Sequence, residues 1–147
     1  MHLLQVTLRN TALALGLAGM SAQAIGEVET DVRCLSSATT PAIRLEWHTF
    51  ADSAAGWFGG YVRSEGKLQV IPIVLSDTQT LSRPSGRPWE FRYVWLEVSN
   101  GRISGEYRLS SQGAEVYDFS YENLRTGKLF LFLEVMSAAQ GGECKWQ

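Results

Sequence analysis

The chain has 147 residues, of which 45% are apolar and 19% charged, with 13 Lys and Arg against 15 Asp and Glu. This balance is typical of one packed domain, and it excludes a wholly disordered chain, a collagen-like chain and a disulfide-dense mini-protein. The formal net charge of -2, without any block of basic residues, argues against nucleic-acid binding. Because the chain has only two His and two Cys, the sequence predicts no metal site and no other cofactor.

The first 24 residues have the three parts of a secretory signal peptide. A weakly basic start precedes an apolar stretch of about ten residues, which is too short to cross a bilayer. Ala22 and Ala24 then form an Ala-x-Ala cleavage site, whereas Met20 stands where a lipoprotein would need Cys. We therefore predict that residues 1–24 are removed, and that residues 25–147 form a periplasmic or secreted domain without a membrane anchor.

Both cysteines, Cys34 and Cys144, lie in the predicted mature chain. In an oxidising compartment, two Cys near opposite ends of a small domain favour one disulfide bond. We predict an intramolecular bridge that joins the first strand to the C-terminal tail. Closing such a long loop should stabilise the fold by about 4 kcal/mol. The alternatives are two buried thiols or a bridge from one Cys to a partner protein.

From residue 28 onward, apolar and polar side chains alternate with a period of two, which indicates strands with one buried face. The dipeptide Asn100-Gly101 favours a type I′ hairpin turn between two of these strands. The sequence predicts an all-β fold, a single antiparallel meander of about eight strands closed as a barrel or a sandwich. The strands are expected near residues 28–35, 43–50, 57–64, 67–75, 90–98, 102–110, 114–122 and 128–136.

Two of the predicted strands are apolar throughout. The segment Leu68 to Leu75 contains Pro72, which has no N–H to donate to a ladder, so we expect it at a sheet edge or a bulge. Residues 128–135 carry Leu on one face and Phe on the other, which predicts a central or fully covered strand.

The sequence offers little that resembles catalytic machinery. His48 falls on the polar side of its strand, and we interpret it as solvent-facing rather than as a catalytic base. Most carboxylates of the C-terminal half alternate with basic neighbours on outward positions, as Glu106 does with Arg108, which predicts that they form cross-strand ion pairs. Asp118 and Glu134 are exceptions, because each interrupts an apolar face. The carboxylates concerned are Glu90, Glu97, Glu106, Glu115, Asp118, Glu122 and Glu134. We predict a protein that is not an enzyme; a glycan-acting enzyme with paired carboxylates is the alternative.

The longest break between predicted strands is residues 76–88, and it leads into a cluster of Arg and aromatic residues. Trp and Arg dominate the hot spots of protein interfaces, and Pro84 and Pro88 reduce the entropy that the loop would lose on binding. The alternative is an ordinary solvated loop whose Trp folds back into the core. The predicted partner-binding residues are Arg83, Ser85, Arg87, Trp89 and Arg92.

A signal peptide, a small mature chain, one disulfide and a β meander together resemble small periplasmic inhibitors and immunity proteins. Such proteins block cell-wall hydrolases, including lysozymes and effectors of type VI secretion. Residues 85–89, Ser-Gly-Arg-Pro-Trp, are similar to the Ser-Gly-x-x-Tyr motif of the membrane-bound and periplasmic C-type lysozyme inhibitors, with Trp in place of Tyr. The Trp-x-Lys-Gly element of that family is missing. The resemblance implies that Ser85 offers its hydroxyl to a catalytic carboxylate, with Arg83 and Arg87 as flanking cations.

We therefore expect an exported, non-enzymatic binding protein that inhibits, or gives immunity against, a cell-wall hydrolase. Its expected partner is an exported or periplasmic protein such as a peptidoglycan hydrolase, and not nucleic acid. A second hypothesis is a lipocalin-like barrel that binds a small apolar ligand. That hypothesis predicts an internal cavity of several hundred Å³ lined by residues such as Trp47, Phe91 and Trp95.

Overall fold

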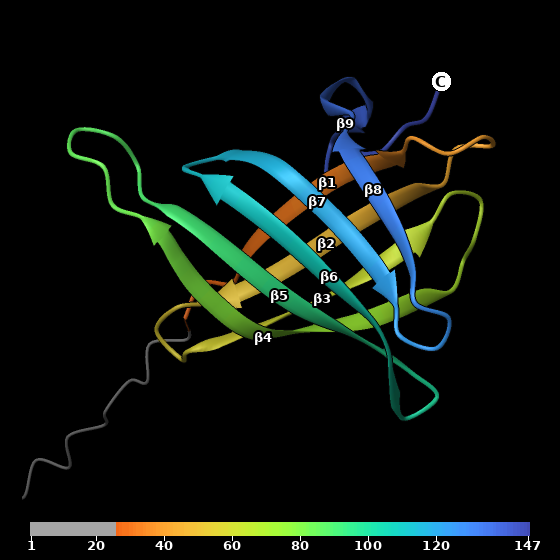
Figure 1. Ribbon diagram of the computed structural model, residues 1–147, viewed down its shortest axis with the longest axis horizontal. Helices are drawn as coiled ribbons and strands as arrows, with labels where there is room; N and C mark the ends of the chain where they lie inside the picture. The colour runs from red at the N-terminus through yellow and green to blue at the C-terminus, as the bar shows by residue number, and fades with distance from the viewer. Residues whose placement is uncertain (1–25) are drawn as a thin grey trace, which may run out of the picture.

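The computed structural model describes residues 26–147, so the predicted signal peptide lies outside the described residues. Within them, each strand pairs with the next along the chain, and the eighth returns to pair with the first, which closes an antiparallel barrel (Figure 1). The predicted all-β meander is confirmed, and of the two predicted alternatives, barrel and sandwich, the structure is a barrel. The strands are β1 (Glu29–Ser37), β2 (Arg44–Asp52), β3 (Trp57–Ser64), β4 (Val70–Ser82), β5 (Glu90–Ser99), β6 (Arg102–Gln112), β7 (Glu115–Asn123) and β8 (Lys128–Glu134).

The C-terminal tail lies against the outside of the barrel. It forms a short 3₁₀ helix, η1 (Met136–Ala138), and a small hairpin of β9 (Ala139–Gln140) and β10 (Glu143–Cys144). The predicted disulfide between Cys34 and Cys144 is confirmed, and it ties β10 to β1. No helix within residues 26–147 is long and apolar enough to cross a membrane.

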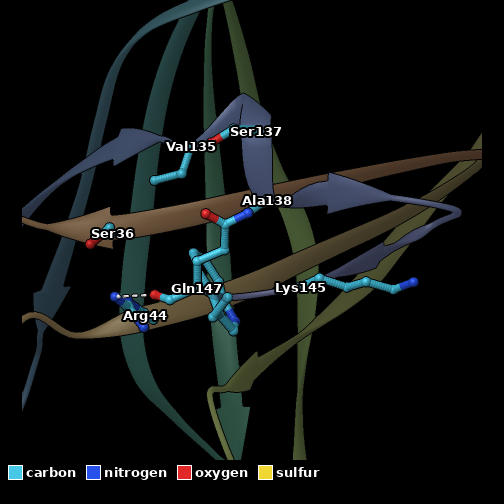
Figure 2. Close-up of a pocket in the computed structure, with 8 residues that line it drawn as sticks. Ser36, Arg44, Val135, Ser137, Ala138, Lys145 and Gln147 are labelled. Atoms are coloured by element: carbon cyan, nitrogen blue, oxygen red, sulfur yellow. Dashed lines mark hydrogen bonds between the residues drawn. The ribbon is translucent and has the colours of Figure 1, made fainter.

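The last residues of the tail reach β2. Arg44 donates a hydrogen bond to the Gln147 carbonyl at 3.3 Å, and its guanidinium lies 5.5 Å from the centre of the Trp146 ring. The tail and the barrel wall border a recess of about 150 Å³ here. Figure 2 shows side chains that line it. Ser36 of β1 and Lys145 of the tail lie on its border. The tail therefore covers part of the outer wall.

The turn between β5 and β6 is the predicted type I′ turn. Asn100 and Gly101 have positive φ angles of 51° and 71°, which this turn requires at both central positions. The dipeptide therefore sets the register in which Ser99 pairs with Arg102.

Strand β4 is longer than the sequence predicts. Instead of ending at Leu75, it continues to Ser82, and its register against β5 shifts between Leu75 and Asp77 and again between Thr80 and Ser82. The sequence predicts a loop for the polar segment 76–82, but its backbone pairs with β5. Backbone hydrogen bonds of this kind do not depend on the polarity of the side chains. The predicted binding loop is therefore shorter, residues 83–89.

Strand β4 is not an edge strand of the closed barrel, but Pro72 lies on a stretch of it that pairs with β3 alone, so the edge expected at Pro72 is present locally. Pro72 pairs with Tyr61 of β3 and lies just beyond the β4–β5 ladder, which begins at Ile73 and Glu97. The bulge of β4 lies further along the strand, after Leu75.

Strand β8 is central, as predicted, because it pairs with β7 on one side and β1 on the other, but it is not covered on both faces. Phe130 and Phe132 point into the barrel, where Phe132 is buried. Leu129, Leu131 and Leu133 point outward, and Leu133 is 71% exposed. A closed single-layer barrel has only one interior, so the second apolar face of β8 remains on its surface.

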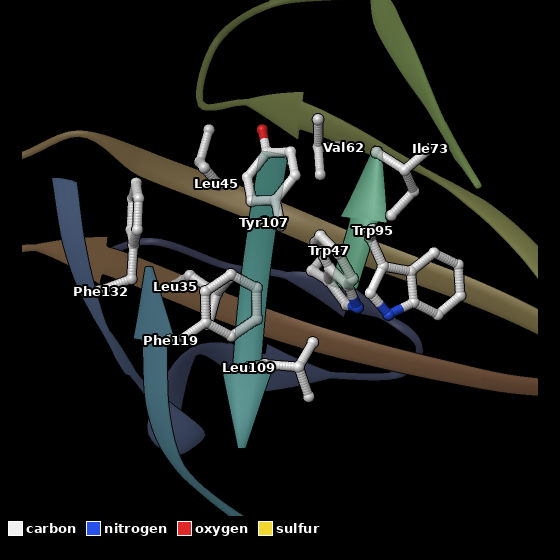
Figure 3. Packing of buried hydrophobic residues seen from close by; sticks show 10 residues of the cluster. All are labelled: Leu35, Leu45, Trp47, Val62, Ile73, Trp95, Tyr107, Leu109, Phe119 and Phe132. Carbon is white, nitrogen blue, oxygen red and sulfur yellow. The ribbon is translucent and has the colours of Figure 1, made fainter. Parts of the chain in front are cut away.

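Aromatic side chains fill the middle of the barrel (Figure 3). Trp47 of β2 is 2% exposed, and its ring meets those of Trp95, Tyr107 and Phe119 at centroid distances of 5.5, 5.1 and 5.1 Å. These contacts are edge to face, the arrangement that aromatic quadrupoles favour. The cluster divides the interior into two recesses, one toward each end.

Candidate functional site

The hairpin of β4 and β5 extends beyond its neighbours at one end of the barrel (Figure 1). Strand β3 pairs with β4 only as far as Val74, so residues 75–82 are paired with β5 alone. The tip, residues 83–89, is the part of the chain in which the predicted partner-binding residues concentrate. The structure therefore places that segment on a protruding hairpin rather than on a long loop.

At the tip, Arg83 and Trp89 face each other across the turn. The Arg83 guanidinium lies 4.5 Å from the centre of the Trp89 ring, a cation–π arrangement. Trp89 is 47% exposed and does not fold back into the core. Its ring continues the row of Phe91 and Tyr93 along β5, with successive centroid distances of 6.3 and 6.0 Å. Aromatic rings therefore follow one another along β5 from the interior of the barrel to the tip of the hairpin.

The other predicted residues divide between the tip and the strand. Ser85 and Arg87 are exposed in the turn on either side of Gly86, whose φ of 71° favours glycine. Arg92 lies further back on β5, where its Nε donates to the Ser110 hydroxyl at 3.4 Å. The structure thus brings Arg83, Ser85, Arg87 and Trp89 together and leaves Arg92 outside this group.

The arginines of the hairpin carry free charge. Within residues 26–147, Arg83, Arg87 and Arg92 form no ion pair with an acidic side chain. Of the other described arginines, Arg102 and Arg125 also form no ion pair, and the remaining four are paired. Arg108 lies 2.6 Å from Glu106 of its own strand and 3.2 Å from Glu122 of β7, and the second contact is a predicted outward cross-strand ion pair. The hairpin is therefore a cationic projection.

The base of the hairpin is braced by Glu90. Its carboxylate accepts hydrogen bonds from the Tyr117 hydroxyl and, at 2.7 Å, from the Ser82 hydroxyl. The hydrogen bond from Tyr117, followed by that from Ser82, lowers the pKa of Glu90, and the same bond raises the pKa of Tyr117. Gln112 of β6 also donates to the Pro88 carbonyl at 3.0 Å. These bonds hold the tip in one orientation.

Beneath the hairpin, a recess of about 220 Å³ opens at the same end of the barrel. Trp47 and Trp95 line it, as the lipocalin-like hypothesis expected, but Phe91 does not. Arg33 points into this end and bridges Asp31 at 2.7 Å and Glu134 at 2.9 Å. The two carboxylates that converge here are thus held by one guanidinium.

A second recess of about 290 Å³ lies at the opposite end of the barrel. Its polar centre is Glu97 of β5, which is 6% exposed and hydrogen-bonded to tyrosine and serine hydroxyls. We predicted an outward carboxylate at this position, and the structure corrects that prediction. The sequence spacing indicates the inward position, because Glu97 lies four and two residues after Tyr93 and Trp95, which point inward. Asp118, in contrast, is exposed on β7 rather than set in an apolar face.

His48 is not solvent-facing, which corrects a further prediction. Its ring stacks on that of Tyr61 at a centroid distance of 4.5 Å, and its Nε2 lies 3.3 Å from Glu46. Glu46 also accepts from Arg63 at 3.0 and 2.5 Å, a hydrogen bond that raises the pKa of this arginine. The outer wall of β2 is therefore covered by side chains of β3. A hydrogen-bonded structural cluster of this kind accounts for Glu46, His48 and Arg63.

No protein-family model, curated protein or solved structure matches the chain. Two features of the barrel bear on its function, the cationic hairpin at one end and the carboxylate recess at the other.

Proposed function

We propose that this protein is an exported, non-enzymatic inhibitor of a cell-wall hydrolase, and that it binds the enzyme with the tip of the β4–β5 hairpin. The observation that carries the proposal is the Arg83–Trp89 stack at the end of a braced, protruding hairpin with unpaired arginines. An exposed aromatic ring beside guanidinium groups is the composition of interface hot spots. Because the tip is held in place before binding, little entropy would be lost on association.

The chemistry of the expected partner complements the hairpin. Enzymes that hydrolyse glycosidic bonds carry a pair of Asp or Glu side chains on either side of the scissile bond. A guanidinium forms strong, two-pronged hydrogen bonds with a carboxylate, so Arg83 and Arg87 suit such a cleft. Ser85 at the end of the turn would donate its hydroxyl to one of the two acids. The hairpin would then occupy the place of the glycan chain.

The proposed compartment is the periplasm or the outside of the cell. The Cys34–Cys144 disulfide supports it, because disulfides persist in oxidising compartments and are rare in the cytosol. The immunity function expected from the sequence would be the same binding activity directed at a hydrolase delivered by another cell.

The test is an inhibition assay with the purified protein. A C-type lysozyme and a panel of periplasmic peptidoglycan hydrolases are assayed on peptidoglycan with increasing amounts of the protein. At least one enzyme should be inhibited in a 1:1 complex, and the variant Arg83→Ala, Arg87→Ala, Trp89→Ala should bind it at least 100-fold more weakly, which corresponds to about 2.7 kcal/mol.

The matched control is Arg102→Ala, Arg125→Ala, which removes two exposed arginines at the other end of the barrel. This variant should inhibit like the natural sequence. Equal inhibition by the triple hairpin variant would reject the hairpin as the binding element, and a panel in which no hydrolase is inhibited would reject the proposed partner class.

A second candidate function is favoured by the recess of about 290 Å³ at the far end of the barrel. This volume is near the lower end of the roughly 300–1,000 Å³ range of small-molecule sites, and aliphatic and aromatic side chains form most of its wall. Under this proposal the barrel binds a small ligand there, rather than in the smaller recess of about 220 Å³ that Trp47 and Trp95 line at the other end. Binding of 2-phenylethanol, measured by calorimetry, tests it.

A further inference from the structure

The far recess contains a buried acid without a counter-ion. Glu97 is 6% exposed, and no Lys, Arg or His among residues 26–147 forms an ion pair with it. Burial of a carboxylate is costly unless it is paired or well hydrogen-bonded. Other buried or half-buried acids of the barrel have an arginine partner, as Glu134 has Arg33 and Glu46 has Arg63. Glu97 differs from both.

Hydroxyl groups alone hold the carboxylate. Oε1 accepts from the Ser104 hydroxyl at 2.7 Å and from the Tyr121 hydroxyl at 3.2 Å, and Oε2 accepts from the Tyr107 hydroxyl at 3.0 Å. A carboxylate has about four acceptor positions, so one position on Oε2 is left for a further donor. Three neutral donors also leave the negative charge uncompensated.

The wall around Glu97 is suited to the apolar part of a ligand. Tyr121 stacks on Phe130 at a centroid distance of 6.2 Å and lies 4.6 Å from the Tyr107 ring. The volume of about 290 Å³ is roughly twice the ~150 Å³ that holds one benzene molecule in an apolar cavity. It therefore fits one ring with a short polar arm. The aliphatic lining residues are Ile43, Leu45, Val62 and Ile71.

We propose that this recess binds a small organic cation, a primary ammonium group on a short apolar or aromatic body. The ammonium donates to the free position on Glu97 Oε2 and neutralises the buried charge, and the apolar body lies against Phe130, Tyr121 and Ile71. Aromatic faces around a cation add attraction through their quadrupoles. This proposal specifies the ligand class for the second candidate function and rests on that function. It is independent of the hairpin, which lies at the opposite end of the barrel.

The same geometry selects against other ligands. An anion would be repelled by the carboxylate, because like charges at close range cost free energy in a low-dielectric site. A neutral alcohol could take the same acceptor position, but a hydrogen bond between two charged partners is about twice as strong. Burial, together with Glu97, raises the pKa of Tyr107 well above 10 and that of Tyr121 to about 12, so both remain neutral donors at pH 7.

Isothermal titration calorimetry of the purified full chain tests the proposal with three ligands of similar shape. Phenethylamine is a cation at pH 7, since alkyl ammonium groups such as that of Lys titrate near 10.4. The neutral probe is 2-phenylethanol, and the anionic probe is 3-phenylpropionate. Phenethylamine should bind at least tenfold more tightly than the alcohol, and the anion should not bind.

Variants locate the site. Glu97→Gln keeps the side-chain shape and removes the charge, so it should weaken phenethylamine binding at least tenfold and leave alcohol binding within about twofold. Glu106→Gln, the matched control, removes an outward carboxylate of β6 and should change neither affinity. Ser64→Phe places a ring in the recess while Glu97 stays intact, and it should abolish binding of both ligands. Circular dichroism confirms the fold of each variant.

The outcomes separate the two proposals. Equal affinity for the alcohol and the amine, or unchanged amine binding in Glu97→Gln, would overturn cation selectivity while leaving a ligand-binding barrel. If Glu97→Gln does not fold, the amine-to-alcohol ratio of the natural sequence and the Ser64→Phe result decide the question. Binding that survives Ser64→Phe would place the ligand elsewhere, and absence of binding by all three probes would reject both proposals.

Discussion

Trp47 of β2 and Phe119 of β7 meet edge to face inside the barrel, with ring centroids 5.1 Å apart and ring planes at 86°. Strands β2 and β7 are not neighbours in the sheet, so this contact crosses the interior. Because Trp47 also contacts Trp95 of β5 and Tyr107 of β6, one side chain joins walls that no backbone hydrogen bond connects.

Replacing Trp47 by Ala should lower the free energy of unfolding by about 3–5 kcal/mol, because a large buried ring is lost and its neighbours cannot fill the space. Urea denaturation followed by circular dichroism measures the change. Trp89→Ala is the matched control: this Trp is exposed, and its loss should change the free energy of unfolding by less than about 1 kcal/mol. Equal losses in the two variants would contradict the role of Trp47 as the centre of the core.

The disulfide should contribute about 2–5 kcal/mol to stability, because it closes a loop with a sequence separation of 110 residues in the unfolded chain. The variant Cys34→Ala, Cys144→Ala should show this loss in urea denaturation. Reducing agent should destabilise the natural sequence by a similar amount and should not affect the double variant. A double variant as stable as the oxidised protein would show that the tail is held by its other contacts, such as that of Trp146 with Arg44.

Gly105 is required because the Tyr121 ring lies directly over it. A Cβ atom at position 105 would overlap that ring, whereas a Cβ atom at Gly59 of β3 would lie 3.9 Å from the Trp57 ring, an ordinary van der Waals contact. Gly105→Ala should cost about 1–3 kcal/mol of stability, as overpacking usually does. Gly59→Ala should be neutral or stabilising by about 0.4–1 kcal/mol. Thermal unfolding of both variants tests this, and a harmless Gly105→Ala would mean that Tyr121 has room to move.

Stability should fall in alkaline solution because of the two tyrosines that bind Glu97. Burial first, and Glu97 second, raise the pKa of Tyr107 well above 10 and that of Tyr121 to about 12. Above pH 10 the unfolded chain releases these protons while the folded chain keeps them, so the unfolded state is favoured progressively up to about pH 12. The stabilisation is fully present below pH 10.

Urea denaturation between pH 9 and 12, with tyrosinate absorbance as a second readout, should show this decline. The variant Tyr107→Phe, Tyr121→Phe should have a shallower dependence on pH, although it is less stable at pH 7 because Glu97 loses two hydrogen bonds. An unchanged slope would assign the alkaline transition to other groups.

Acid should loosen the hairpin through Glu90. Hydrogen bonds from Tyr117 and Ser82 lower the pKa of this carboxyl from 4.5. Its contribution to stability is therefore fully present above pH 4.5 and is lost as the pH falls through the lower pKa of the folded state. Hydrogen exchange of the amides in residues 76–90 should therefore accelerate in acid relative to the core strands. Glu90→Gln should produce the same local acceleration at pH 7, and hairpin amides that remain protected in this variant would contradict the brace.

Most strands could be predicted because alternation and turn chemistry are local. Asn100-Gly101 fixed one hairpin through its own backbone preference, and the spacing of the two cysteines indicated the disulfide. The same alternation, followed strictly, would have placed Glu97 inside. The basic residues that alternate with most carboxylates of the C-terminal half predict a surface position for Glu97 instead, and a local pattern does not show that three hydroxyls from other strands converge on it.

Other features depended on what packs against a strand. The ring of Tyr61 on β3 buries His48, and closure into one layer leaves Leu133 on the surface. Likewise, β4 continues through a polar segment because β5 supplies the backbone partners.

The sequence by itself determined the strands, their order and the disulfide bond, since these follow from the period of the side chains, the conformation of the turns and the residue types. Tertiary structure decided the closure into a barrel, the exposure of Trp89 on a projecting hairpin and the recess around Glu97. Each of these arises from groups far apart along the chain, and their burial and hydrogen bonding exist only once the strands have come together.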